Sequence, residues 1–118
     1  PKILNEEFID TYCKLWSLPG AQQAMLKVLR SICTIFGPRE DVLHKTMSNL
    51  HRITASTLII WGKQDALLPV EQAYFTKERI RNSQLHVFDQ CGHMPNFEKP
   101  DEFNRVVRAF LLDSLTSS

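Results

Sequence analysis

An aspartate and a histidine, Asp65 and His93, are the residues of this sequence best suited to proton transfer, and each follows a short apolar segment. Asp65 lies four residues beyond Trp61, and His93 lies five residues beyond Phe88. A carboxylate can accept a hydrogen bond from one imidazole nitrogen, which fixes the tautomer and leaves the other nitrogen as a general base. The residue types therefore predict an acid and base pair, provided that the fold brings their two loops together.

The segments before the two loops predict parallel strands. Residues 57–61 are short, apolar and rich in β-branched side chains, which favours a strand covered on both faces, and residues 84–88 predict a second strand. Between them, Pro69 suits the first turn of a helix running to about Ile80. Strands joined through a helix are normally parallel, so both loops leave the carboxyl edge of the sheet, where catalytic groups collect. A last helix is predicted from Pro100.

The first fifty residues predict helices. Apolar residues recur at three- and four-residue spacing from an N-cap at Asn5 to Trp16, and again over residues 21–36. Leu18-Pro19-Gly20 separates these helices, and Gly37-Pro38 ends the second one. A weaker helix is predicted over residues 42–50.

Composition limits the classes of function. The 118 residues carry a net charge of +1 with scattered basic residues, which argues against a nucleic-acid partner or a charged membrane-surface patch. Apolar residues make up 43% but form only short runs, so we expect one globular unit with no membrane span. The three widely spaced cysteines favour free thiols in a reducing compartment, and we expect a cytoplasmic location.

From Thr57 to Leu112 the sequence resembles the C-terminal part of an α/β-hydrolase. The matching motifs are Leu-Ile-Ile-Trp-Gly-Lys-Gln-Asp at 58–65, Leu-Leu-Pro at 67–69, Cys-Gly-His at 91–93, Glu-Lys-Pro at 98–100 and the last helix. The resemblance implies that Asp65 is the acid and His93 the base of a catalytic triad, in the family's chain order. It also implies an α/β fold class, with a helical lid segment at 1–52 and the last strand-helix-strand-helix of a parallel sheet at 53–118.

The third member of such a triad is missing from these residues. No Gly-x-Ser-x-Gly or other Gly-x-nucleophile-x-Gly elbow occurs, and no His-Gly-type oxyanion loop occurs. With the start at Pro1, this leads us to expect the carboxyl portion of a longer hydrolase that acts on an ester or related carbonyl by covalent catalysis. We expect the chain alone to be inactive and to self-associate or to pair with the missing N-terminal half.

Two other functions stay open at this point. The chain can be a non-catalytic binding or interaction fragment, or it can belong to a dehalogenase- or epoxide-type member of the same fold. In either hydrolase case the partner is a small-molecule substrate, and we expect no cofactor and no metal, because Cys91 and His93 supply only two ligands.

Several further residues have two readings. Leu67, Leu68 and Met94 flank the predicted pair and are either walls of an apolar pocket or plain packing. Asp89 is the competing acid, although stabilisation of the loop turn is the simpler role. Glu98 is expected to tie the histidine loop to the last helix.

The helical half offers few other candidates. Tyr12 is either a lid acid, as in the epoxide-hydrolase branch, or a helix-core tyrosine. Trp16, Met25 and Phe36 are expected in the core of the helical segment rather than against substrate. The remaining histidines are read as solvated helix residues, at His44 and His51, and as a strand residue, at His86.

Overall fold

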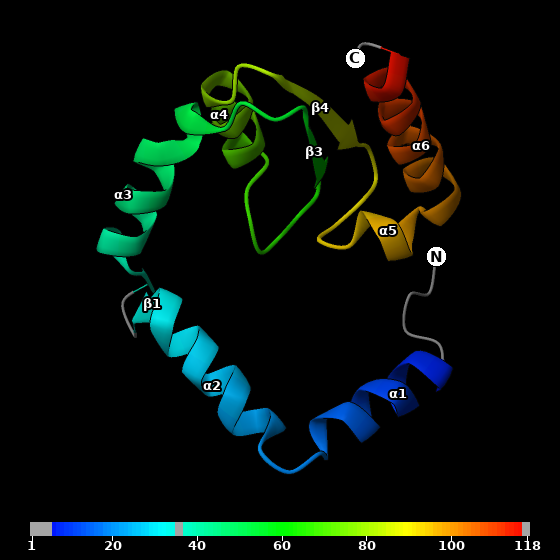
Figure 1. Cartoon of the computed structure of the whole chain (residues 1–118). Helices are drawn as coiled ribbons and strands as arrows, with labels where there is room; N and C mark the ends of the chain where they lie inside the picture. Colours follow the sequence, from blue (N-terminus) through cyan, green and yellow to red (C-terminus); the bar gives the residue numbers. More distant parts are fainter. Residues whose placement is uncertain (1–5, 35–36, 117–118) are drawn as a thin grey trace. The chain divides into compact units, whose positions relative to one another are not determined.

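The computed structural model describes residues 6–34 and 37–116, without the side chains of Pro38 and of residues 114–116 (Figure 1). The chain divides into two compact units, residues 1–48 and 49–118. Within the described ranges, none of the helices combines the length and the apolarity that a membrane span requires.

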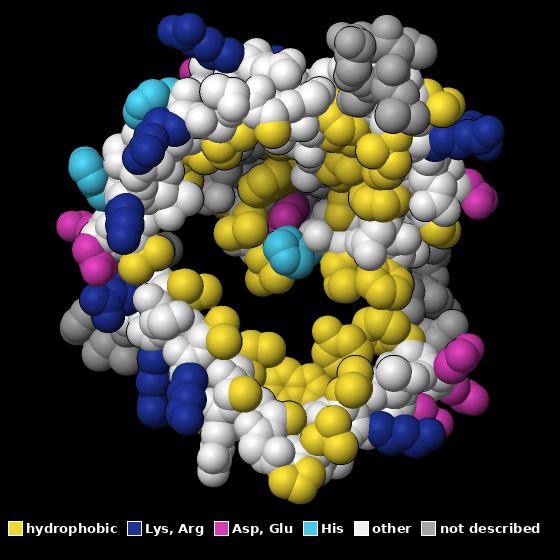
Figure 2. Space-filling model, in the orientation of Figure 1, with side chains coloured by type: hydrophobic (Ala, Val, Ile, Leu, Met, Phe, Trp, Pro, Cys, Tyr) yellow, Lys and Arg dark blue, Asp and Glu magenta, His cyan; other side chains and the backbone are white. Residues whose placement is uncertain are grey.

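The first unit is mainly helical. Its elements are α1 (Glu6–Trp16), α2 (Ala21–Ile32), β1 (Cys33–Thr34), β2 (Gly37–Pro38) and α3 (Glu40–Asn49). Apolar side chains line one side of α1 and α2, and charged side chains line the other (Figure 2). The predicted break between these two helices is confirmed, and Gly20 occupies it with a φ of 83°, a left-handed conformation that glycine adopts without strain. Asn5, the predicted N-cap, lies outside the described residues.

The prediction that the second helix extends to residue 36 is wrong. The helix α2 ends at Ile32, and Cys33 and Thr34 instead pair with Gly37 and Pro38 in a two-residue antiparallel ladder. The backbone N–H of Arg39 donates to the carbonyl of Ile32 at 2.8 Å, which closes the turn. Gly37 has a φ of 126°, and the β-branched Thr34 prefers extended backbone, so both favour the ladder over continued helix.

The second unit contains the parallel strands. Its elements are the 3-10 helix η1 (Leu50–Arg52), β3 (Thr57–Gly62), α4 (Glu71–Arg79), β4 (Ser83–Phe88), α5 (Pro95–Glu98) and α6 (Pro100–Thr116). The strands β3 and β4 lie side by side and pair in parallel, from Thr57 opposite Ser83 to Gly62 opposite Phe88 (Figure 1). The predicted strand-helix-strand-helix order and the parallel pairing are therefore confirmed, and the loops after β3 and β4 leave the same edge.

A small core holds these elements together. The buried apolar residues are Ile59 of β3, Ala73 of α4, Ile80, Phe88 of β4 and Cys91. Phe88 is fully buried, and its ring stacks on Phe103 of α6 with centroids 6.5 Å apart. Burial of an aromatic side chain of this size stabilises a fold by about 1.5–3 kcal/mol. Because Phe88 is the last residue of β4, this packing fixes the point from which the histidine loop starts.

Two details of this unit differ from the sequence prediction. The helix α4 begins at Glu71, so Pro69 lies just before its N-cap, Val70, rather than in its first turn. The carbonyl of Pro69 accepts the N–H of Gln72 at 3.0 Å, which makes residues 69–72 a turn that leads into the helix. The four-residue helix α5 was not predicted, because a single turn is too short for a periodic apolar pattern.

Candidate active site

Asp65 is held in the turn that follows β3. Its Oδ1 accepts the backbone N–H of Leu67 at 2.8 Å and the N–H of Leu68 at 3.0 Å. The indole Nε1 of Trp61 donates to the carbonyl oxygen of Leu68 at 2.9 Å and fixes the far side of the same turn. One carboxylate oxygen is therefore satisfied within its own loop, and the other, Oδ2, is turned away from these amides.

His93 contacts that second oxygen. Its Nδ1 lies 2.8 Å from Asp65 Oδ2, across 28 positions of sequence. The Asp65 side chain is 4% exposed, whereas the His93 side chain is 46% exposed. An ionised carboxylate only accepts hydrogen bonds, so Nδ1 carries the proton and Nε2 of the neutral imidazole has a lone pair. The predicted approach of these two side chains at one sheet edge is confirmed.

The surroundings of Asp65 favour its ionised form. Burial by itself raises the pKa of this carboxyl, but the hydrogen bond with His93 and those from the amides of Leu68 and Leu67 lower it more. The pKa of Asp65 consequently lies below its ordinary value. The carboxylate is charged at neutral pH and able to stabilise a positive charge on the imidazole.

Backbone contacts join the acid loop directly to the histidine loop. The N–H of Lys63 donates to the carbonyl of Phe88, and the N–H of Gln64 donates to the carbonyl of Cys91, both at 2.9 Å. The side chain of Gln64 binds the same residue, because its Oε1 accepts the N–H of Cys91 at 3.0 Å. These bonds extend the pairing of β3 and β4 beyond the strands and set the distance between the two loops.

Asp89 contacts the acid loop. Its carboxylate lies 3.2 Å from Lys63 Nζ and accepts a hydrogen bond from Gln64 Nε2 at 3.4 Å. The hydrogen bond with Lys63 lowers the pKa of Asp89, and Gln64 adds to the effect. Of the two acids weighed from the sequence, Asp65 is the one that contacts the histidine, whereas Asp89 contacts Lys63 and Gln64.

Glu98 also contacts the histidine loop. Its Oε2 accepts the N–H of Gly92 at 2.8 Å, and its Oε1 accepts the N–H of Met94 at 3.0 Å. The sequence predicted that Glu98 ties this loop to the last helix; the structure places the residue one step earlier, at the end of α5. The sequence did not predict the Gln64 contact, since no residue pattern signals a long-range amide bond.

A small cavity opens beside the pair. It has a volume of about 110 Å³, and its lining residues are Ile60, Trp61, Gly62, Asp65, Leu68, His93 and Pro95. Of the three residues predicted as pocket walls, Leu68 is in this lining and Leu67 and Met94 are not. Leu67 is 71% exposed. The sequence did not single out Ile60 or Pro95, which only the conformation of the loops brings to the cavity.

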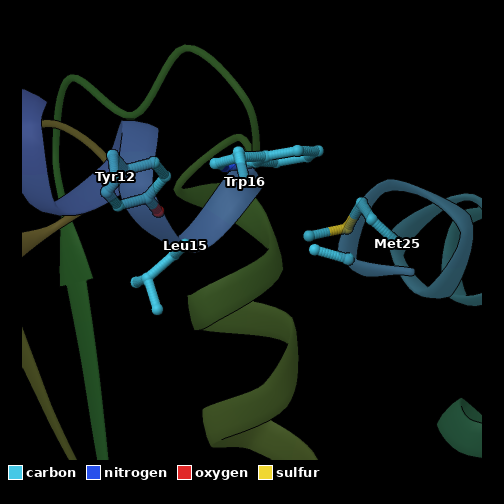
Figure 3. A pocket seen from close by; sticks show the side chains of 5 residues that line it. Tyr12, Leu15, Trp16 and Met25 are labelled. Carbon is cyan, nitrogen blue, oxygen red and sulfur yellow. The ribbon is translucent and has the colours of Figure 1, made fainter. Parts of the chain in front are cut away.

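A larger apolar cavity lies in the first unit. It has a volume of about 250 Å³ between Tyr12, Leu15 and Trp16 of α1 and Ala21 and Met25 of α2 (Figure 3). The expectation that Trp16 and Met25 are buried in a helical core is wrong for this chain, because they are 38% and 41% exposed. Two amphipathic helices do not enclose a core by themselves. Phe36 lies outside the described residues.

Cys91 has no features of a nucleophile or a metal ligand. Its side chain is buried, and burial raises the pKa of the thiol, with the nearby Glu98 carboxylate adding to the effect. The described part of the chain contains no cluster of three or more His, Cys, Asp or Glu residues suited to a metal ion. Cys13, Cys33 and Cys91 are free cysteines in the structure.

Comparison with known families assigns the fold of the chain. The family model for the α/β-hydrolase fold matches residues 9–100, which is most of the chain. The chain belongs to the α/β-hydrolase fold family. The predicted family and fold class are thereby confirmed.

Several relatives of this α/β-hydrolase chain are known. It is 47% identical over 62 residues to 2-hydroxy-6-oxononadienedioate/2-hydroxy-6-oxononatrienedioate hydrolase 1 of Pseudomonas putida, covering 52% of this chain and 22% of the relative. It is 28% identical over 116 residues to 2-hydroxymuconate semialdehyde hydrolase of Pseudomonas putida, covering 95% and 39%. The chain thus spans well under half the length of these two relatives.

Solved structures show the same fold. A serine hydrolase involved in carbazole degradation superimposes with a TM-score of 0.79 at 23% identity, over 92% of this chain and 40% of that structure. A meta-cleavage product hydrolase, CumD, superimposes with a TM-score of 0.73 at 27% identity, over 95% and 40%. The similarity therefore includes the helical residues that precede the strands as well as the strands themselves.

Proposed function

We propose that this chain supplies the acid and the base of a hydrolase catalytic triad, with Asp65 as the acid and His93 as the base. The observation that carries the proposal is the 2.8 Å contact between His93 Nδ1 and Asp65 Oδ2, made by an acid whose Oδ1 is already bound by two amides. This arrangement orients the imidazole with Nδ1 toward the acid and Nε2 toward a reacting group.

The proposed chemistry uses His93 Nε2 twice. As a nucleophile attacks the substrate carbonyl, Nε2 takes its proton, and the carboxylate of Asp65 stabilises the resulting imidazolium. Nε2 then gives that proton to the departing group, which leaves a covalent acyl intermediate. Water repeats the sequence and releases the acid product. The nucleophile and the oxyanion donors come from outside these 118 residues, because the sequence contains no nucleophile elbow.

The names of the relatives indicate a substrate class. They are hydrolases of 2-hydroxy-6-oxo dienoates and of 2-hydroxymuconate semialdehyde. Those compounds contain hydroxyl, carboxylate and carbonyl groups but no ester or amide, so their hydrolysis must cleave a carbon–carbon bond beside a carbonyl. We propose this class for the complete protein, within the broader class of ester-like carbonyl substrates that the sequence indicated.

Within the proposal, residues 1–52 form a helical lid and residues 53–118 form the end of the hydrolase core. The apolar surfaces of α1 and α2 suit contact with an apolar partner or ligand. Leu67, Leu68 and Met94 are proposed as pocket walls, with Leu68 supported by its place in the cavity beside His93. The chain is proposed to be the carboxyl portion of a longer enzyme.

The test uses the complete protein with 2-hydroxy-6-oxo-6-phenylhexa-2,4-dienoate and an activated ester as substrates. Replacement of the proposed general base, His93→Ala, is expected to abolish turnover of both, measured by the loss of dienoate absorbance and by the release of the alcohol from the activated ester. His51→Ala is the matched control, because His51 is exposed on η1, and it should keep wild-type turnover. Wild-type turnover in folded His93→Ala would refute the triad assignment.

A further inference from the structure

Glu98 binds the backbone on both sides of His93. Its Oε2 accepts the N–H of Gly92 at 2.8 Å, and its Oε1 accepts the N–H of Met94 at 3.0 Å. One carboxylate therefore accepts the N–H of the residue before the histidine and the N–H of the residue after it. Hydrogen bonds to an ionised acceptor are shorter and stronger than bonds between neutral groups, so this pair of contacts restrains the loop firmly.

Glu98 and Met94, the residue before α5, are joined by reciprocal hydrogen bonds. The carbonyl oxygen of Met94 accepts the N–H groups of Phe97 and Glu98, both at 2.9 Å. Met94 thus gives its N–H to the Glu98 side chain and receives the Glu98 N–H on its carbonyl, a reciprocal pattern like that of a capping box. Pro95 at the start of α5 has no N–H to satisfy, so the short helix needs few other caps.

The approach of the carboxylate to the loop is close. A Cβ added to Gly92 would lie 3.0 Å from Glu98 Oε1 and 3.4 Å from Oε2. Glycine at this position therefore leaves the space that the carboxylate occupies against the backbone. The Gln64 side chain binds the N–H of Cys91 at 3.0 Å. The backbone just before His93 is therefore bound by two side chains, Gln64 at Cys91 and Glu98 at Gly92.

We propose that Glu98 is a positioning residue that sets the direction of the His93 ring toward Asp65. The Cα–Cβ direction of His93 follows from the two peptide planes beside it. Glu98 binds the N–H of Met94, which belongs to the plane after His93, and the N–H of Gly92, which belongs to the peptide just before the other plane. The contact with Asp65 then fixes only the rotation of the ring. A displacement of about 1 Å at a catalytic group can cost on the order of 100-fold in rate. This inference rests on the proposed function of His93.

The test is Glu98→Gln in the complete protein. Glutamine has nearly the size of glutamate, but its amide nitrogen cannot accept a hydrogen bond, so one of the two loop amides loses its partner. We expect kcat to fall about 10- to 100-fold with KM within about twofold of wild type. In proton NMR, the downfield resonance of the His93 Nδ1–H that binds Asp65 should shift or broaden in the variant.

Glu102→Gln is the matched control. Glu102 is the neighbouring carboxylate on α6 and contacts Lys99 at 3.7 Å and His86 at 3.8 Å. Its replacement should leave both kcat and the His93 resonance unchanged. The proposal is overturned if folded Glu98→Gln keeps the wild-type resonance or the wild-type kcat, or if its lost activity only follows the unfolded fraction.

The two proposals fail in different ways. If the triad assignment is wrong, His93→Ala keeps its turnover, and Glu98→Gln has no reason to change kcat. If only the role of Glu98 is wrong, His93→Ala is inactive while the Nδ1–H resonance of Glu98→Gln matches wild type.

Discussion

A Cβ atom on Gly62 would lie 1.9 Å from the backbone carbonyl oxygen of Gly92 and 2.6 Å from that of Cys91. The end of the strand that leads to the acid therefore packs backbone to backbone against the loop that bears the histidine. No side chain larger than hydrogen fits between them without a shift of one backbone. This approach is as important to the site as the contact between the two side chains, because it brings the loops within reach.

Gly62→Ala should therefore be strongly destabilising. Overpacking of a tight site costs typically about 1–3 kcal/mol, and here the obstacle is backbone rather than the end of a flexible side chain. The free energy of unfolding measured with urea should fall by that amount or more. Gly92→Ala is the comparison, because the nearest atoms to its Cβ would be those of the Glu98 side chain, at 3.0 Å and beyond, rather than backbone. An equal or smaller loss for Gly62→Ala would contradict the structure.

Asp65→Asn should leave the fold in place and lower turnover of the complete protein by orders of magnitude. The amide of asparagine favours the wrong imidazole tautomer and removes the charge that stabilises the imidazolium; in a serine-protease triad this change costs about 10⁴ in kcat. Steady-state kinetics provide the measurement. Asp89→Asn serves as the control, because Asp89 contacts Lys63 and Gln64. Equal losses in the two variants would argue against Asp65 as the acid.

The lowered pKa of Asp65 predicts a pH dependence of stability. Its folded-state pKa lies below the ordinary value, so the stabilisation is present above the ordinary carboxyl pKa, about 3.9, and is lost as pH falls through the folded-state pKa. Wild type should exceed Asp65→Asn in unfolding free energy at neutral pH, and the gap should narrow below about pH 4. Urea titrations followed by Trp61 fluorescence in a Trp16→Phe background measure this. A constant gap would mean that Asp65 has an unshifted pKa.

The three free cysteines should react at very different rates. Cys13 is exposed, whereas the Cys91 thiol is buried and has a raised pKa, and thiolate is the reactive form. A thiol reagent at neutral pH should modify Cys13 rapidly and Cys91 only after unfolding, which peptide mass spectrometry resolves. Rapid modification of Cys91 in the folded protein would show that the histidine loop opens.

The sequence predicts the approach of Asp65 and His93 well because the features that create it are local. Short apolar runs before Asp65 and His93 predict the strands, the helix between them predicts parallel pairing, and parallel pairing places both loops at one edge. The structure bears out each of these steps.

The contacts that hold the histidine loop in place cannot be predicted from local sequence in this way. Gln90 adopts a positive φ of 49°, which its side-chain type does not suggest, and that turn brings Cys91 to the Gln64 side chain. Glu98 reaches the loop only because the single-turn helix α5 folds back on it. The end of α2 was misplaced because the pairing of Cys33 with Pro38 outweighs a continuous helical pattern.

Asp65, His93 and the described hydrogen bonds that join their loops all belong to residues 49–118. The 2.8 Å distance between the two side chains is thus set by contacts within this unit. Under the proposed function, substitutions in α1 and α2 are expected to change which molecules are accepted while the contact between Asp65 and His93 stays in place. Substrate preference and proton transfer would then be separable by mutation, the first through residues 6–32 and the second through the loops after β3 and β4.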